Sequence, residues 1–383
     1  MRVAFYAPMK APTDPVPSGD RKIARLFFRV LNDAGHEVQL VSRFRSWEGA
    51  GDGARQQRLR DIGGRLAERL LRRYRTRPAK HWPEAWFTYH LYHKAPDWLG
   101  PRVSRSLGIP YVIAEASYAP KQAGGSWVIG HQAAGAAISQ AAAIVALNSS
   151  DIPGVLPLLN CPRRLVPLKP FLDTSEYPPP DHLGRERVAL RRRFGLDTKR
   201  PLLLTVAMMR YGNKLSCYQM LGRALKLMTD HRVTLLIVGD GPARAQVEAA
   251  FAGISHHQIV FAGLQSHDML KNFYAAADLF VWPAVDEPMG MALLEAQAAG
   301  LAVVAGDSRG VPDIVRHRVS GLLVSPGDAQ AFAHAVVSLL ENPLRLREMR
   351  AAARALAMCE HDIATAVAKL NGVLEHVRQG ALP

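Results

Sequence analysis

Short apolar runs of strand length alternate along the chain with stretches whose apolar residues fall at helical spacing. Residues 2–7 form the first run, residues 20–34 follow with a helical pattern that Gly35 ends, and residues 37–41 form the next run. Nine more runs follow, at 86–91, 111–114, 144–147, 202–207, 234–238, 258–261, 279–282, 302–305 and 321–324. Alternating strands and helices over this length predict parallel sheets with helices on both faces, an α/β fold.

Proline interrupts this alternation once. Pro167, Pro170 and the run Pro178-Pro179-Pro180 exclude a helix or an inner strand there, and a charged helix at 186–194 precedes the next strand. We therefore predict two similar domains, 1–170 and 171–365, joined by a hinge near 168–182. The last segment, 366–383, is either an appendage or a helix that crosses back to the first domain.

Composition narrows the class of protein. The chain has 383 residues, 48% of them apolar, and a formal charge of +15, which is a globular and basic composition. Residues 1–180 carry 25 basic and 14 acidic side chains, so most of the excess lies in the first half. Three scattered cysteines exclude a disulfide framework, and the absence of a signal-peptide pattern favours the cytoplasm.

Three predicted strands of the second half end in loops suited to anions. Arg210 and Lys214 follow the strand at 202–207, and Gly239 and Gly263 follow the strands at 234–238 and 258–261. Ligands bind at the carboxyl ends of the strands in open α/β sheets, and Arg and Lys pair with phosphate oxygens. Taken singly, each loop is equally compatible with a solvated loop or an ordinary strand-to-helix turn.

The fourth loop, "AADLFVWPAVDEPMGMALLEAQAAG" (276–300), carries more chemistry. Glu287 precedes a predicted helix that Gly290 opens, and Glu295 lies about one turn inside it. Free amides at 289–292 suit a diphosphate, and the two carboxylates suit ribose and sugar hydroxyls. The alternative is that Glu287 complements the helix dipole and that Glu295 is a solvated helix residue.

These four stretches together resemble the nucleotide-binding domain of GT-B retaining glycosyltransferases of family four (glycosyl transferases group 1). "VGDGP" (238–242), the "E…G…LEA" pattern of 287–296, "GVPDIV" (310–315) and "GLLVSPGD" (321–328) all match the family's motifs. The resemblance is strong over about 200–330 and weaker in 34–42, 107–115 and 147–151. It implies two Rossmann-like domains facing each other across a cleft, the first binding acceptor and the second nucleotide-sugar.

The resemblance also implies roles. Arg210 and Lys214 would neutralise the leaving diphosphate, Glu287 would orient the donor sugar, and Glu295 would bind ribose. The remaining nucleotide contacts would come from Gly239, Gly263, Met289, Gly290, Met291, Leu294 and, in the first domain, Gly19 in the loop Pro17-Ser18-Gly19-Asp20. No Asp-x-Asp occurs in the chain, so we expect neither a metal nor any other cofactor.

Two features of the first half depart from the family pattern. Where many relatives carry a His after the fourth strand, this chain reads Glu115-Ala116-Ser117, so Glu115 takes either a catalytic role or a capping role. His90 and His93 lie at the end of the strand at 86–91 or just after it. His93 either lines the cleft or serves only to stabilise the fold, and we expect the latter of His90.

Residues 43–80 carry 11 Arg and Lys80 against four acidic residues, with Leu59, Ile62, Leu66 and Leu70 at helical spacing. Such a segment fits either an anionic membrane surface or a surface helix packed on its own domain. A nucleic-acid partner is disfavoured, because no aromatic residues interleave with the charges.

The reading that combines these features is a retaining, metal-independent glycosyltransferase acting on a polysaccharide, lipopolysaccharide or lipid-linked acceptor. It would be cytoplasmic, at the inner face of the membrane. The alternatives are a nucleotide-sugar epimerase of GT-B fold and a non-catalytic nucleotide-sugar-binding protein.

Overall fold

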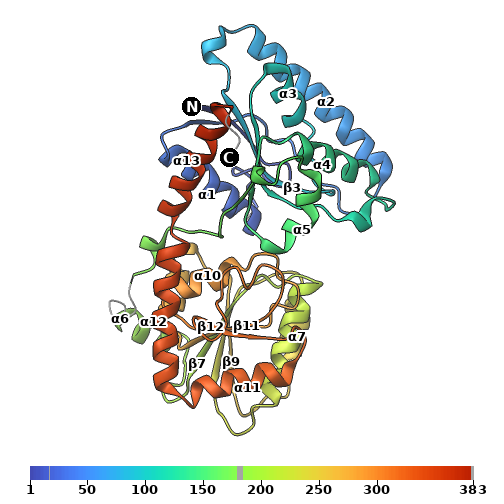
Figure 1. The fold of residues 1–383 in the computed structure, drawn as a ribbon. Coiled ribbons are helices and arrows are strands. Elements are labelled where there is room, and N and C mark those ends of the chain that lie inside the picture. Colours follow the sequence, from blue (N-terminus) through green and yellow to red (C-terminus); the bar gives the residue numbers. More distant parts are fainter. Residues whose placement is uncertain (17, 179–183, 381–383) are drawn as a thin grey trace. The chain divides into compact units, whose positions relative to one another are not determined.

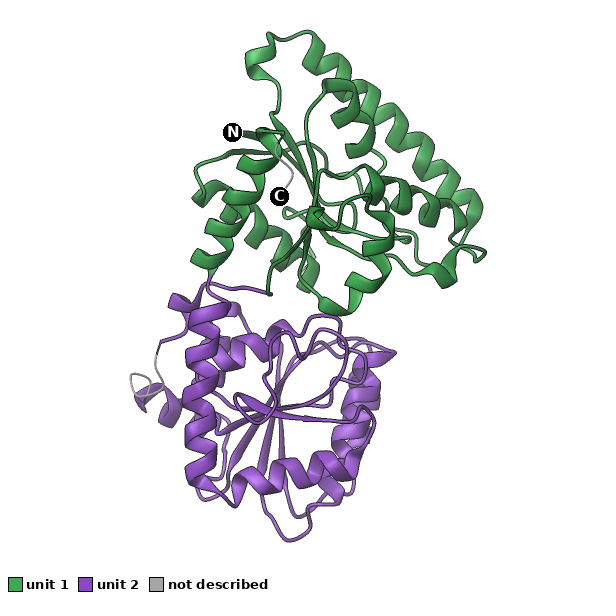
Figure 2. Cartoon of the chain, viewed as in Figure 1, with its two compact units in different colours: residues 1–169, 363–383 green, residues 170–362 purple. Residues whose placement is uncertain are grey.

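The computed structural model describes residues 1–16, 18–178 and 184–380, which form two compact units (Figure 1, Figure 2). Unit 1 is Met1–Lys169 with Ile363–Pro383, and unit 2 is Pro170–Asp362. The sequence placed these divisions at 170/171 and 365/366, one and three residues further along the chain. Pro17 of the predicted phosphate loop and Pro179 and Pro180 of the predicted hinge lie outside the described residues.

Unit 1 contains a six-stranded sheet of order β2-β1-β3-β4-β5-β6, in which every pairing is parallel. Its strands are β1 (Arg2–Tyr6), β2 (Glu37–Leu40), β3 (Ala85–Leu91), β4 (Tyr111–Ala116), β5 (Ala143–Ala146) and β6 (Leu165–Pro167). The sequence predicted the first five and missed β6, which is three residues long and ends in Pro167. Proline is tolerated there because β6 is the edge strand, where a missing N–H leaves no inner ladder bond broken.

Helices cover both faces of this sheet, with α1 and α13 on one side and α2, α3 and α4 on the other (Figure 1). They are α1 (Gly19–Asp33), α2 (Gly53–Arg75), α3 (Gly100–Leu107), α4 (Val128–Gln140), the one-turn α5 (Ile152–Val155) and α13 (Ile363–Arg378). Short 3₁₀ turns connect them at η1 (Ala79–His81), η2 (Pro120–Gln122), η3 (Ser149–Asp151), η4 (Leu156–Leu158) and η5 (Pro162–Arg164). The C-terminal helix α13 thus belongs to unit 1 and packs against α1.

Asp97 ties two strands of unit 1 to a helix. Its buried carboxylate accepts hydrogen bonds from the hydroxyls of Thr88 on β3, at 2.5 Å, and Tyr111 on β4, at 3.0 Å. It also accepts from the backbone amides of Leu99 and Gly100 at the start of α3, at 2.8 and 2.7 Å. Four donors satisfy a buried charge that would otherwise be costly, so this carboxylate fixes where α3 meets the sheet.

The arginine-rich segment forms α2, whose apolar side is used within unit 1. Ala67, Leu70, Leu71 and Tyr74 are buried in the core, and α2 packs against α3 and α4. Gly63, which weakens the helix on propensity, lies where an added Cβ would meet Trp98 at 2.3 Å, so the glycine permits close packing. Of the apolar stripe read from the sequence, Leu70 is buried in this core and Leu66 packs against it, whereas Leu59 and Ile62 are half-buried.

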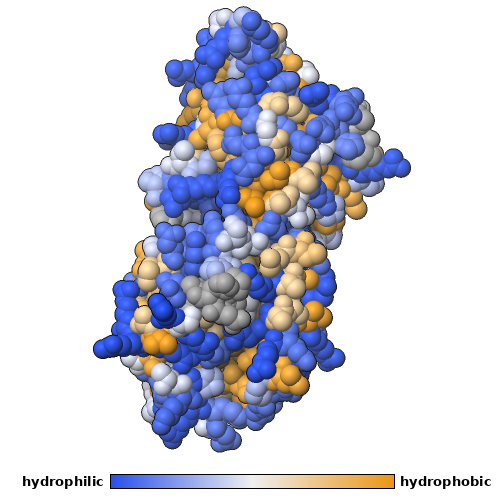
Figure 3. Space-filling model, turned by 90° about the vertical axis from the view of Figure 1, so that its left-hand side faces the viewer, coloured by the Kyte–Doolittle hydropathy of each residue, from blue (hydrophilic) through white to orange (hydrophobic). Residues whose placement is uncertain are grey.

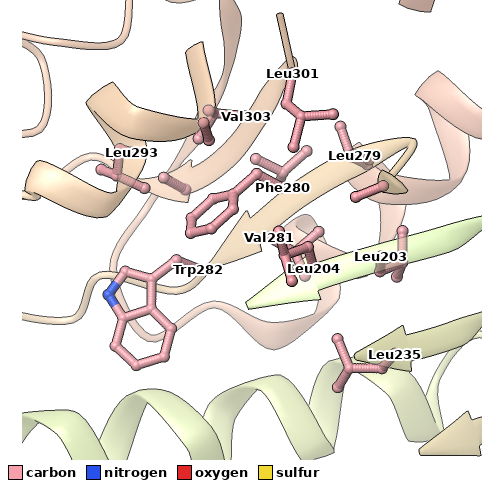
Figure 4. Packing of buried hydrophobic residues seen from close by; sticks show 14 of the residues in the cluster. Leu203, Leu204, Leu235, Leu279, Phe280, Val281, Trp282, Leu293, Leu301 and Val303 are labelled. Atoms are coloured by element: carbon pink, nitrogen blue, oxygen red, sulfur yellow. The ribbon is translucent and has the colours of Figure 1, made fainter. Parts of the chain in front are cut away.

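Unit 2 repeats the architecture with a parallel sheet of order β12-β11-β10-β7-β8-β9. Its strands are β7 (Leu202–Val206), β8 (Thr234–Val238), β9 (Gln258–Gly263), β10 (Leu279–Trp282), β11 (Val303–Gly306) and β12 (Gly321–Val324). Its helices are α6 (Gly184–Arg193), α7 (Asn213–Lys226), α8 (Arg244–Ala250), α9 (His267–Ala276), α10 (Met291–Ala298), α11 (Ala329–Leu340) and α12 (Pro343–Glu360), with η6 at Thr174–Glu176. Figure 4 shows the apolar side chains of β7, β10 and β11 packed between sheet and helices, with Trp282 at the end of β10.

Both ends of unit 2 are bonded to each other. The Leu172 amide donates to the His361 carbonyl at 3.0 Å, and the His361 ring lies 2.6 Å from the Pro170 carbonyl. The Thr174 hydroxyl donates to the Asp362 carboxylate. The two chain segments that connect unit 2 to unit 1 therefore leave it side by side.

The face in Figure 3 is mostly hydrophilic, with apolar residues in small groups. Within residues 1–16, 18–178 and 184–380, no helix has the length and apolar character needed to cross a membrane.

Candidate functional site

Two glycine turns shape the carboxyl edge of the unit 2 sheet. Gly239, after β8, has φ +139°, and an added Cβ would lie 1.9 Å from the Ala207 carbonyl oxygen after β7. The Gly239 amide donates to the carbonyl of Gly263 at 2.9 Å, and Gly263 ends β9 with φ +68°. Glycine at position 239 therefore lets the ends of β7 and β8 approach closely, whereas glycine at position 263 allows the left-handed backbone that ends β9.

A cation and a carboxylate predicted from the sequence meet at this edge. Lys214, in the first turn of α7, places Nζ 2.5 Å from Glu287 Oε2 in the loop after β10. Trp282 Nε1 donates to the same oxygen at 3.1 Å, and Lys214 Nζ lies 5.1 Å above the Trp282 ring. Glu287 is therefore held by two donors, one from the first turn of α7 and one from the end of β10.

The second predicted cation is placed differently. Arg210 is exposed in the loop between β7 and α7, and its guanidinium lies 3.1 Å from the Met208 sulfur. Lys214 is thus held against Glu287, whereas Arg210 stays at the surface of the same loop.

The loop that carries Glu287 leads into helix α10, which begins at Met291. Gly290 precedes it in the left-handed conformation, with φ +75°, and an added Cβ would meet Leu293 at 2.8 Å. The first amide bonded back within this turn is that of Leu293, to the Gly290 carbonyl at 2.8 Å, so Met291 and Ala292 precede the helical hydrogen bonds. Met289 is buried and Leu294 is wholly so, hence the Leu294 side chain is committed to the core and only its backbone lies near the helix start.

Glu295 is not a solvated helix residue, which was the alternative for it. It is 6% exposed, and its Oε2 accepts a hydrogen bond from the buried Tyr274 hydroxyl at 2.8 Å. Burial, and secondly the nearby Glu295 carboxylate, raise the pKa of Tyr274 well above its ordinary value. Tyr274 therefore remains a neutral donor that holds Glu295 in one orientation.

Sequence reasoning missed the residues that hold this loop. Asn213 and Arg309 bond the two oxygens of Asp286, at 2.6 and 3.4 Å, and Ser308 accepts from the Glu287 amide at 3.3 Å. Arg309 and Ser308 follow β11, far along the chain from Glu287. No spacing rule links them to it, and Trp282 was read only as the end of a strand.

The remaining predicted residues lie in unit 1. Gly19 is the first residue of α1, whose N-cap Ser18 accepts from the Arg21 amide at 3.2 Å. Glu115 is in β4, and His90 beside it on β3 bonds Asp20 of α1 at 3.0 Å. His93 contacts the Trp127 ring edge-on, and burial together with Lys94 and His131 lowers its pKa to about 4. The sequence did not connect His90 with Asp20, which are 70 residues apart.

Known proteins share this architecture and parts of this sequence. The chain is 33% identical over 41% of its length to an uncharacterised glycosyltransferase of Methanocaldococcus jannaschii, of which it spans 40%. It is 28% identical over 67% of its length to the alpha-maltose-1-phosphate synthase of Mycolicibacterium smegmatis, of which it spans 70%. The crystal structure of Anabaena Alr3699/HepE in complex with UDP and glucose superposes with a TM-score of 0.70 at 17% identity, covering 98% of this chain and 99% of that one.

Two helix-covered parallel sheets in this order, superposing over their whole length on glycosyltransferase structures, constitute the GT-B fold. Residues 200–342 match the family model of glycosyl transferases group 1. The fold class inferred from the sequence is thereby confirmed, and the match over these residues is consistent with the family that the motifs resemble.

The two edge glycines should respond differently to alanine. At Gly239 the methyl group collides with backbone, so we expect Gly239→Ala to lower the free energy of unfolding by about 3 kcal/mol. At Gly263 no atom lies within 4 Å of the added Cβ, so Gly263→Ala meets only the left-handed strain of about 1–2 kcal/mol. Urea unfolding of both variants measures the difference, and equal losses would contradict the steric account.

Proposed function

We propose that this protein is a retaining, metal-independent glycosyltransferase that moves a sugar from a nucleotide-sugar donor to a polysaccharide, lipopolysaccharide or lipid-linked acceptor. The observation that carries the proposal is the Lys214–Glu287 pair, set between the glycine edge of β8 and β9 and the start of α10. It places a cation, a carboxylate and unbonded helix amides at one edge, the combination that a sugar diphosphate needs.

The bonds broken and formed assign the roles. The bond between the anomeric carbon and the diphosphate oxygen breaks, and its electron pair leaves with the nucleoside diphosphate. Lys214 and Arg210 stabilise the negative charge that develops there, and Glu287 holds the donor sugar through its hydroxyls. The acceptor hydroxyl oxygen forms the new bond on the same face, and its proton passes to the leaving phosphate.

Metal independence rests on the same residues. A divalent cation in such a reaction is bound through carboxylates and phosphate oxygens. Here the carboxylate beside the candidate diphosphate site is already neutralised by Lys214 and bonded by Trp282. The lysine and arginine supply the positive charge that a metal would otherwise bring.

Exchange of the two paired residues separates binding from turnover. We expect Glu287→Gln to lower kcat about 100-fold or more, because the donor sugar loses its orienting carboxylate, with nucleoside diphosphate affinity retained. Lys214→Met should weaken nucleoside diphosphate binding roughly 10- to 100-fold, because a charged hydrogen bond is lost. Lys226→Met, at the exposed far end of the same helix, is the matched control.

Wild type and these variants are compared with UDP-, GDP- and ADP-sugars as donors. Calorimetry measures the affinity, and proton NMR identifies the products. Unchanged turnover in Glu287→Gln would overturn the site, an epimerised donor would favour the epimerase, and inversion at the anomeric carbon would overturn retention. Binding without any turnover of the wild-type protein would favour the non-catalytic alternative.

Removal of divalent cations tests the electrostatic account. We expect turnover in excess EDTA to stay within about twofold of that in Mg²⁺, because no ion bridges the diphosphate. The measurement is nucleoside diphosphate release before and after chelation. A loss that Mg²⁺ restores would contradict metal independence.

We also propose that the exposed side of α2 attracts this protein to the anionic inner face of the membrane from the cytoplasm. The helix presents eight exposed arginines, Arg55, Arg58, Arg60, Arg65, Arg69, Arg72, Arg73 and Arg75. Since the apolar side of α2 packs within unit 1, the attraction is electrostatic and does not insert the helix. Each such cation contributes about 1 kcal/mol near an anionic surface.

Flotation with phosphatidylcholine vesicles, with and without phosphatidylglycerol, tests this surface. We expect binding only to the anionic vesicles at about 0.1 M salt and release at about 1 M, because salt screens exposed charges. Exchange of Arg65, Arg69, Arg72 and Arg73 for Gln should abolish it. The control exchanges four exposed arginines of unit 2, Arg192, Arg223, Arg232 and Arg347. Equal loss in both variants would show an effect of net charge only.

A further inference from the structure

Two neighbouring strands of unit 1 carry an unusual backbone conformation at the same level. Tyr89 of β3 pairs with Ala114 of β4, and Leu91 pairs with Ala116, so His90 and Glu115 lie opposite each other. Both have positive φ, at 61° and 59°. Residues with a Cβ rarely adopt this conformation, and such strain clusters where binding or catalysis requires a fixed side chain.

The two side chains meet a third group from α1. His90 Nδ1 lies 3.0 Å from Asp20 Oδ1, in the first turn of α1, and the His90 ring stacks on Tyr92 with centroids 5.1 Å apart. These contacts fix the imidazole through Nδ1 and through one face of the ring.

Glu115 is held less completely. The Tyr89 hydroxyl interacts with its carboxylate and lowers its pKa, but the Oε2 atom is shielded from solvent and has no hydrogen-bond partner. The residue also lines a small, mostly apolar recess with Asn148 and Asp151. A buried carboxylate oxygen without a donor is costly, and a purely structural glutamate would be expected to have one. The strained backbone and the unmatched oxygen together indicate a ligand group.

The charges at this position complement each other. Burial by itself would lower the pKa of His90, but the carboxylates of Glu115, Asp20 and Asp151 raise it to about 9, so the ring is an imidazolium at neutral pH. Burial raises the pKa of Glu115, against the opposing effect of His90. The cluster therefore offers one strong donor beside one strong acceptor. A sugar hydroxyl both donates and accepts, whereas an ammonium group only donates and is repelled by the imidazolium.

We propose that Glu115, His90 and Asp20 form a binding site for the hydroxyl groups of a sugar ring. Glu115 Oε2 accepts from one hydroxyl, His90 Nε2 donates to a neighbouring hydroxyl oxygen, and Asp20 positions His90. The inference rests on the proposed function, and the sugar belongs either to the donor or to the acceptor.

The test compares Glu115→Gln and His90→Gln with wild type in the full-length protein. Calorimetry with UDP-glucose, GDP-mannose and ADP-glucose identifies the nucleotide-sugar that wild type binds, and that compound and its nucleoside diphosphate are then used throughout. If the site holds the donor sugar, both variants bind the nucleotide-sugar about tenfold or more weakly while the diphosphate binds equally. If it holds the acceptor, both affinities are retained and the KM for a methyl glycoside acceptor rises by a similar factor.

Glu37→Gln is the matched control, because Glu37 is exposed on β2 of the same unit. Thermal melting checks that each variant is folded. If Glu115→Gln does not fold, the comparison of His90→Gln with wild type is used as the test. Asp20→Asn tests the positioning role. Without the Asp20 charge, the pKa of His90 falls toward the ordinary histidine value of about 6.5. Sugar binding by this variant should therefore weaken as the pH rises from 6 to 8, whereas sugar binding by wild type should not change over this range.

This proposal is overturned if wild type and both variants bind the nucleotide-sugar equally and release diphosphate equally, with and without methyl glycosides. That result would leave the proposed function intact. If wild type binds no nucleotide-sugar, the proposed function itself is overturned, and the sugar-binding site that rests on it is overturned with it.

Discussion

Strands buried on both faces leave a parallel sheet little room for chemistry except at its carboxyl edge. In unit 2 the side chains of β8 and β10 are buried throughout, so none of them reaches solvent from within a strand. Polar and charged groups therefore collect in the loops that follow the strands, and the separation between neighbouring strands sets how closely those groups approach. This constraint places Lys214 against Glu287, whereas in unit 1 the pairing of β3 with β4 places His90 opposite Glu115 near the ends of these strands.

The two units satisfy the constraint by different means. Unit 2 uses glycine turns after β8 and at the end of β9, together with one ion pair braced by Trp282. Unit 1 uses side chains, with two strained residues on paired strands and an acid from α1. Backbone and fixed cations suit a diphosphate, whereas a paired donor and acceptor suit hydroxyl groups. The division matches the two chemical parts of a nucleotide-sugar reaction.

The positive charge of the chain has more than one origin. Lys214 has a specific carboxylate partner, while the excess lies on α2, where the arginines point away from a helix face that is used for packing. Periodicity alone predicted an amphipathic helix. It left open whether the apolar stripe faces a membrane or a protein core, because both environments are apolar. In unit 1 the core provides that environment for Leu70 and in part for Leu66, whereas Leu59 and Ile62 are half-buried.

By itself the sequence determined most of the strands, the order of the elements and the resemblance to group 1 glycosyl transferases, because apolar runs and glycine-bearing turns are local signals. It did not show β6, which is too short for a periodic pattern and contains a proline that an edge position tolerates. It named Glu287, Lys214 and Glu115, yet not what holds them: Trp282 and Ser308 for Glu287, and His90 with Asp20 beside Glu115. Contacts between loops far apart in sequence depend on strand order and register, which only the tertiary structure decides.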